Sequence, residues 1–291
     1  MSTLPVVGFI GTGVMGRSMA GHLLSAGHEL HVFNRSKAKA QPLIDAGAHW
    51  HDTADGVVKV AEVVVTIVGF PKDVEQTYLG AKGVVETAKP GSLFIDMTTS
   101  SPELAIRIAK AAKARGCEAL DAPVSGGDVG AREARLVIMA GGEAEAFERA
   151  KPVLSLMGKN VLRQGGPGAG QHCKMANQIA IAAGMLAWVE ALAYARKAGL
   201  DPARVLESIS GGAAGSWSMT NLAPRALAGD FDPGFYVKHF LKDMRIALEA
   251  AAAMKLELPG LACAKKLYDR IAEHGWEECG TQALYRLYTT Q

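Results

Sequence analysis

Residues 4–16 read LPVVGFIGTGVMG, a short apolar run that leads directly into a glycine-rich turn. A helical pattern of apolar residues, Met19, Leu23 and Leu24, follows the turn and ends at Gly27. A strand, a GxGxxG turn and a helix in this order are typical of a dinucleotide-binding unit, because the glycines let the backbone approach a pyrophosphate at the helix N-terminus. The residues of this turn that we expect to contact the cofactor are Gly11, Thr12, Gly13, Val14, Met15 and Gly16.

The end of the second predicted strand, Glu29 to Phe33, bears on the choice of cofactor, because NAD-binding units usually carry an acid there for the ribose hydroxyls. This chain has Asn34, Arg35 and Ser36 instead, and the arginine would attract a 2′-phosphate that an acid would repel. NADP(H) is therefore the predicted cofactor, with NAD(H) as the alternative. If Arg35 is only a solvated turn residue, the preference stays open.

Strands and helices alternate along the first part of the chain, with buried-looking strands at 62–68, 92–96, 118–122 and 135–140. From Gly165 to Gly199 the sequence reads as one long helix, and helices follow at 200–209, 216–227, 238–254, 260–274 and 281–287. We predict an α/β protein: an N-terminal Rossmann-type doubly wound sheet, residues 1–164, joined through a long interdomain helix to an all-α C-terminal domain, residues 165–291.

Two loops follow predicted strands at the edge where doubly wound folds bind ligands. The first contains Gly69 and Pro71, and we expect a cofactor contact from Val68, Gly69, Pro71 and Val74. The second is Ser125-Gly126-Gly127, whose bare backbone amides predict an anion-binding nest.

The start of the long helix carries three polar residues on one face, because Lys174, Asn177 and Gln178 stand at i, i+3 and i+4. An amine beside two amides can hold a carbonyl or hydroxyl oxygen and move its proton. The alternative is a surface lysine that keeps its charge in water.

Composition excludes several classes of protein. The 291 residues are 49% hydrophobic and carry a formal charge of +2, and no basic run predicts a nucleic-acid surface. The four cysteines, Cys117, Cys173, Cys263 and Cys279, have neither disulfide nor metal-ligand spacing, so we expect no metal. Because Met1 to Gly8 lacks a signal pattern and no apolar segment reaches about 18 residues, we expect a cytoplasmic protein without a membrane partner.

Four motifs together resemble one family. They are GFIGTGVMG at 8–16, DAPVSGG at 121–127, GAGQHCKMANQ at 168–178 and KDMRIAL at 242–248. In this order they resemble the β-hydroxyacid dehydrogenases, the family of 3-hydroxyisobutyrate dehydrogenase and tartronate semialdehyde reductase (2-hydroxy-3-oxopropionate reductase). The resemblance implies an NADP-dependent enzyme that reduces a small aldehyde or keto acid.

The resemblance also implies roles for individual residues. Lys174 becomes the catalytic lysine, with Asn177 and Gln178 beside the substrate, and Ser125, Gly126 and Gly127 bind the substrate carboxylate. Thr99 lies at the nicotinamide side, Lys242 closes over cofactor and substrate, and Asp243 orients Lys242. The family implies a homodimer or homotetramer.

The exact substrate stays open at this point. Asn177-Gln178 and the GGAAGS segment at 211–216 resemble the tartronate semialdehyde reductase branch, whereas Ala134-Arg135 replaces a usual Gly-Thr and Trp217 adds a bulky ring. A 3-hydroxyisobutyrate, succinic semialdehyde or glyoxylate enzyme is the alternative within the family. An imine reductase, which typically lacks the lysine, and a non-catalytic NADPH-binding protein are the alternatives outside it.

Overall fold

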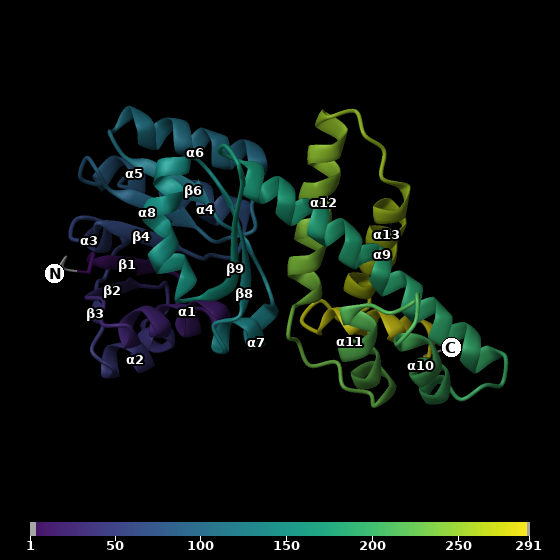
Figure 1. Cartoon of the computed structure of the whole chain (residues 1–291). Helices are drawn as coiled ribbons and strands as arrows, with labels where there is room; N and C mark the ends of the chain where they lie inside the picture. The colour runs from purple at the N-terminus through teal and green to yellow at the C-terminus, as the bar shows by residue number, and fades with distance from the viewer. Residues whose placement is uncertain (1–3, 290–291) are drawn as a thin grey trace. The chain divides into compact units, whose positions relative to one another are not determined.

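The computed structural model describes residues 4–289 and divides into two compact units, Met1–Lys174 and Met175–Gln291. The division falls inside the long helix, whereas the predicted boundary, between residues 164 and 165, lies before that helix. Figure 1 shows the sheet of the first unit and the helices of the second.

The first unit is built on one sheet with the strand order β3-β2-β1-β4-β5-β6-β8-β7, and β9 pairs with β8. The first six strands are parallel, and their order 3-2-1-4-5-6 is that of a Rossmann fold, as predicted. The strands are β1 (Val7–Ile10), β2 (Leu30–Phe33), β3 (His49–Trp50), β4 (Val63–Thr66), β5 (Leu93–Asp96), β6 (Glu118–Asp121), β7 (Val124–Ser125), β8 (Leu136–Gly141) and β9 (Gly158–Gly165).

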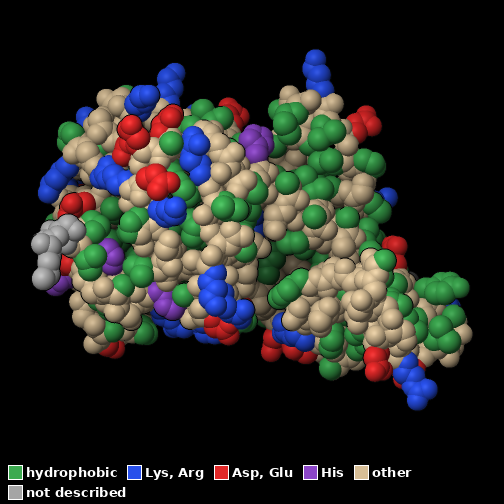
Figure 2. All heavy atoms as spheres, viewed as in Figure 1, with side chains coloured by type: hydrophobic (Ala, Val, Ile, Leu, Met, Phe, Trp, Pro, Cys, Tyr) green, Lys and Arg blue, Asp and Glu red, His purple; other side chains and the backbone are tan. Residues whose placement is uncertain are grey.

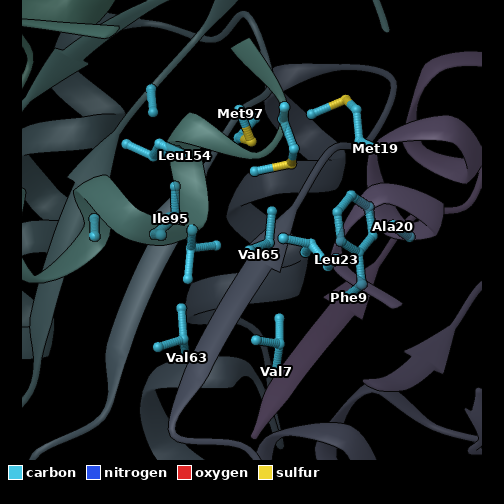
Figure 3. Close-up of a cluster of buried hydrophobic side chains, with 14 of the residues drawn as sticks. Val7, Phe9, Met19, Ala20, Leu23, Val63, Val65, Ile95, Met97 and Leu154 are labelled. Atoms are coloured by element: carbon cyan, nitrogen blue, oxygen red, sulfur yellow. The ribbon is translucent and has the colours of Figure 1, made fainter. Parts of the chain in front are cut away.

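Helices cover both faces of this sheet. They are α1 (Val14–Ser25), α2 (Lys37–Asp45), α3 (Ala54–Val58), α4 (Pro71–Leu79), α5 (Val84–Thr87), α6 (Pro102–Ala114), α7 (Gly127–Arg132) and α8 (Ala144–Ser155). Apolar side chains of β1, β4 and β5 pack against α1 and α8 on one face, as the cluster around Phe9, Leu23 and Val65 illustrates (Figure 3). A second cluster on the other face includes Val57, Tyr78 and Ile108. The central strands are buried on both sides, which is why they read as unbroken apolar runs.

Four short or polar elements of the first unit are missing from the sequence prediction: α5, α7, β7 and β9. The strand β9, GKNVLRQG, is mostly exposed and shows no apolar alternation. It forms because β8 offers it a parallel partner from Leu136 to Gly141, and such long-range pairing leaves no local signal.

The second unit is helical, as predicted. It contains most of α9 (Ala169–Lys197), followed by α10 (Pro202–Ser210), α11 (Trp217–Leu227), α12 (Val237–Ala253), α13 (Pro259–Glu273) and the 3-10 helix η1 (Thr281–Tyr288). Its core gathers around the fully buried Trp188. The helix α9 starts four residues later than predicted, because Gly165 and Gly168 have φ angles of 153° and 86° that no helix accepts.

By length and composition alone, α9 meets the requirement for a membrane span, with a mean hydropathy of 1.4 over its most apolar window. The prediction that no apolar segment reaches about 18 residues is therefore wrong for this helix. In the second unit, however, Met185, Trp188 and Leu192 of α9 belong to the protein core. Packing in this core explains the apolar character of these positions.

Candidate functional site

The glycine turn between β1 and α1 has the backbone that a dinucleotide cradle needs. A Cβ on Gly11 would meet the Ile67 carbonyl oxygen at 2.1 Å, and one on Gly16 would meet the Gly11 oxygen at 2.0 Å, so these two glycines allow the tight turn and the close packing of α1. At Gly13, by contrast, a Cβ would meet no protein atom within 4 Å. Gly13 also precedes α1 without a side-chain cap, which leaves the first amides of the helix for a phosphate.

The end of β2 is tied to this turn by Asn34. Its Oδ1 accepts a hydrogen bond from the Thr12 amide at 3.1 Å, and its Nδ2 donates to the Ser36 oxygen at 2.9 Å. Arg35 extends into solvent, with its side chain 84% exposed and its Nη1 lying 3.5 Å from Asp73 Oδ1. Asn34 thus shapes the turn, while the exposed guanidinium of Arg35 follows it at the end of β2.

The loops after β4 and β5 are held by buried polar contacts. The Thr98 hydroxyl accepts a hydrogen bond from the Val68 amide at 2.9 Å, which joins the two loops. The Thr66 hydroxyl donates to Asp96 Oδ1 at 2.8 Å. Thr99, the next residue after Thr98, is half-buried, and Gly69, Pro71 and the buried Val74 follow β4 at the same edge of the sheet.

Asp121, at the end of β6, anchors the first turn of α9. Its two carboxylate oxygens accept hydrogen bonds from the Gly168 and Gln171 amides, each at 2.8 Å. Burial raises the pKa of Asp121 to about 6, although these two amide donors oppose the rise. The Gln171 side chain accepts from the Ser100 amide at 2.9 Å and donates to the Thr98 oxygen at 2.8 Å, so it connects the helix to the loop after β5.

Lys174 lies one turn further along α9, within the first unit. Its side chain is buried, with the residue only 6% exposed, and its Nζ donates a hydrogen bond to the Val124 oxygen at 2.8 Å. A buried amine is not a snorkelling surface lysine, so that alternative is wrong. The contact places the amine at the residue directly before Ser125.

The loop of Ser125, Gly126 and Gly127 follows at once. Gly126 and Gly127 have φ angles of 130° and 62°, in the region that favours glycine. Because neither glycine carries a Cβ, a small anion can approach the backbone of this loop, and an anion nest here stays a prediction. Ser125 is half-buried and pairs with Val137 of β8, so a rigid strand fixes the start of the loop.

The other predicted polar residues belong to the second unit, where they form a chain of contacts. The Asn177 amide donates to Gln178 Oε1 at 2.8 Å, and Gln178 Nε2 donates to Asp243 Oδ2 at 2.6 Å. Asp243 Oδ1 lies 3.1 Å from the Lys242 ammonium. Gln178, Lys242 and Asp243 are all buried, and Gln178 has both ends of its amide engaged. Asp243 thus holds the Lys242 ammonium, and Gln178 holds the Asn177 side-chain amide.

The sequence analysis does not single out Asp121 or Gln171, although each stands inside one of the motifs. Asp121 opens DAPVSGG, and Gln171 is the first polar residue of GAGQHCKMANQ. Their contacts join residues about 50 and 70 positions apart, which only the folded chain brings together.

A Rossmann sheet with an open glycine turn, followed by a helix that holds a buried lysine beside the loop of Ser125, Gly126 and Gly127, is typical of one class: the nicotinamide-dependent oxidoreductases. Residues 6–166 match the family described as the NAD binding domain of 6-phosphogluconate dehydrogenase. Residues 168–288 match the family described as NAD-binding of NADP-dependent 3-hydroxyisobutyrate dehydrogenase.

Known proteins narrow the class. An uncharacterized oxidoreductase of Bacillus subtilis is 58% identical, over 97% of this chain and 98% of its own. The 2-hydroxy-3-oxopropionate reductase of Escherichia coli is 40% identical, over 96% and 95%. The structure of the Mycobacterium tuberculosis 3-hydroxyisobutyrate dehydrogenase with L-serine superposes with a TM-score of 0.90 at 30% identity, over 98% and 99%. The chain belongs to the β-hydroxyacid dehydrogenase family and is an NAD(P)-dependent oxidoreductase that acts on CH–OH groups.

Proposed function

We propose that this protein is an NADP(H)-dependent reductase that converts a small aldehyde or keto acid of the tartronate semialdehyde kind to the hydroxy acid. The observation that carries the proposal is the buried Lys174 amine, bonded to Val124 directly before the Ser125 loop. The amine that we propose as the acid therefore adjoins the loop that we propose as the carboxylate site. The Escherichia coli relative, named for the same reaction, supports the substrate class.

The residues of the glycine turn fit a dinucleotide. The uncapped start of α1 would hold the pyrophosphate, and the open space at Gly13 allows its close approach. Arg35 would attract the 2′-phosphate, which favours NADP(H) over NAD(H). When bound, the dinucleotide supplies the hydride.

Lys174 would supply the proton. As negative charge develops on the substrate oxygen, its ammonium stabilises that oxygen and donates a proton, which is worth roughly 10² to 10⁴ in rate. The Ser125 hydroxyl and the Gly126 and Gly127 amides would hold the carboxylate and so fix the carbonyl group. The roles of Asn177 and Gln178 on the substrate, and of Lys242 and Thr99 on the cofactor, rest on the motifs and are part of the same proposal.

We also propose that the protein is located in the cytoplasm.

A substrate of the 3-hydroxyisobutyrate kind is the second candidate, because the family matched by residues 168–288 is described by that activity. One assay separates the two. Tartronate, methylmalonate and succinic semialdehydes and glyoxylate are each reduced with NADPH and with NADH. We expect the highest kcat/KM for tartronate semialdehyde with NADPH. A higher value for methylmalonate semialdehyde would favour the second candidate, and no turnover of any acid would contradict the proposal.

Arg35 offers a separate test of the cofactor. We expect Arg35→Glu to lower kcat/KM for NADPH at least tenfold, because a carboxylate repels the 2′-phosphate, and to leave the value for NADH within about threefold. The measurement is initial-rate kinetics with both cofactors, and Lys37→Glu, two residues further on at the start of α2, is the control for a general change of surface charge. Equal effects of Arg35→Glu on kcat/KM for the two cofactors would show that Arg35 does not determine the preference for NADPH.

A further inference from the structure

Four side chains with metal-binding groups meet at the β3 edge of the sheet. His31 lies on β2, and Glu29 directly precedes that strand. His49 lies on β3, and His51 follows it. His31 and His49 are register partners in the parallel β2–β3 pair, and residues two apart along a strand project from the same face. All four side chains therefore stand on one face of a two-strand ladder.

The distances within this group are short. His31 Nε2 lies 3.0 Å from Glu29 Oε1, and His31 Nδ1 lies 2.8 Å from His51 Nε2. The rings of His31 and His49 stack with their centroids 4.8 Å apart. One ligand atom from each of Glu29, His31 and His49 lies within 4.8 Å of the other two. No helix or loop has to move to bring these three donors together.

We propose that Glu29, His31 and His49 form a binding site for a divalent transition-metal ion, with Zn²⁺ as its expected occupant. Two imidazoles and one carboxylate are a donor set that zinc accepts, with water in the fourth tetrahedral position. Bonds of about 2.0–2.2 Å require the donor atoms to lie closer together than 4.8 Å. Glu29 and His49 are exposed, whereas His31 is buried, so we expect the side chains of Glu29 and His49 to adjust to the metal.

His51 orients the His31 ring through a hydrogen bond. With the metal on His31 Nε2, the hydrogen of that ring sits on Nδ1 and is donated to His51 Nε2, the pattern that orients metal-ligating histidines. The His51 ring packs over Gly56 of α3, where a Cβ would meet its Nδ1 at 2.9 Å.

The site is independent of the proposed reductase chemistry. None of its residues belongs to the glycine turn, the Ser125 loop or the start of α9. A metal here would join β2 to the two-residue edge strand β3, so we expect it to act on stability and not on turnover. Histidine side chains on the surface of the first unit are visible in Figure 2. The site cannot be predicted from the sequence, because only strand pairing brings residues 31 and 49 together.

Zinc titration of the untagged, chelator-treated full chain tests the proposal. Calorimetry should give one Zn²⁺ per chain, and Zn²⁺ should raise the melting temperature. His49→Ala should weaken binding about 100-fold or more and abolish the thermal shift, Glu29→Gln should weaken binding at least tenfold, and His51→Ala should weaken it about 10- to 100-fold. His274→Ala, which removes an exposed histidine of the second unit, should bind like the wild type.

Two results would overturn the proposal. One is the absence of saturable binding at millimolar Zn²⁺. The other is binding that neither His49→Ala nor Glu29→Gln weakens, which would indicate that the cysteines coordinate the zinc. NADPH binding by each variant establishes that it has folded. The first result would mean that Glu29, His31 and His51 form only a hydrogen-bond network and do not bind metal.

Discussion

At the scale of single residues, the position of Lys174 depends on Asp121. The Asp121 carboxylate holds the amides of Gly168 and Gln171, and Lys174 follows Gln171 by one helical turn. Gln171 reaches from the same turn to the loop after β5. A buried carboxylate that accepts two backbone amides and a glutamine that bridges two loops therefore set where the amine stands.

Asp121 gives a prediction for pH. Its pKa is higher in the folded protein, about 6, than its ordinary 3.8, so its contribution to stability is fully present below pH 3.8 and is lost as the pH rises through 6. The difference corresponds to about 3 kcal/mol. Asp121→Asn does not titrate, so the stability of the variant relative to wild type should rise by about 2 kcal/mol between pH 4 and pH 7, measured by urea unfolding. A difference that stays constant over this range would refute the assignment.

At the scale of elements, the connection from α7 to β8 contains a strained residue. Ala134 has a φ angle of 50°, a left-handed conformation that costs a residue with a Cβ about 1–2 kcal/mol. The family resemblance places glycine here. The turn nevertheless forms, because β8 pairs with three other strands and fixes the chain on its far side.

Ala134→Gly should therefore stabilise the first unit. We expect a gain of about 1 kcal/mol, after the extra backbone entropy of glycine, and a melting temperature higher by about 2–4 °C in calorimetry. Ala114→Gly, at the helical end of α6, is the matched control and should lower stability. A loss of stability in both variants would mean that the strain at Ala134 is relieved elsewhere.

Several elements could be predicted from sequence because their signals are local. The turn at Gly11, Gly13 and Gly16 and the length of α9 depend on residues close together in the chain. The burial of Lys174 could not be predicted, because it depends on Val124, 50 positions earlier. The strand β9 could not be predicted either, because it forms only by pairing with β8. The contacts of Asp121 could not be predicted, because its amide partners stand at the start of α9.

At the scale of the whole molecule, the chain combines a nucleotide-binding unit and a helical unit, and we propose that it works as a homodimer or homotetramer. Support comes from α9 in the second unit, where Ala180, Ala183, Ala187 and Tyr194 are exposed along one side of an otherwise core-forming helix. Small residues on a long helix allow another helix to approach closely.

A charge on that side should separate the subunits. We expect Ala183→Arg to shift the mass measured by light scattering from a multiple of 30.6 kDa toward 30.6 kDa, because burying an unpaired charge at an interface is costly. Ala252→Arg, at an exposed position near the end of α12, is the control and should not change the mass. A wild-type protein that is already monomeric would contradict the proposal.

Single-turnover reduction of tartronate semialdehyde with saturating NADPH by Lys174→Ala measures whether Lys174 is the general acid. We expect the hydride-transfer rate to fall about 10²- to 10⁴-fold while NADPH binding stays within about threefold of wild type. Lys197→Ala, in the exposed last turn of the same helix, should retain the wild-type rate. A Lys174→Ala rate within about threefold of wild type would contradict the account.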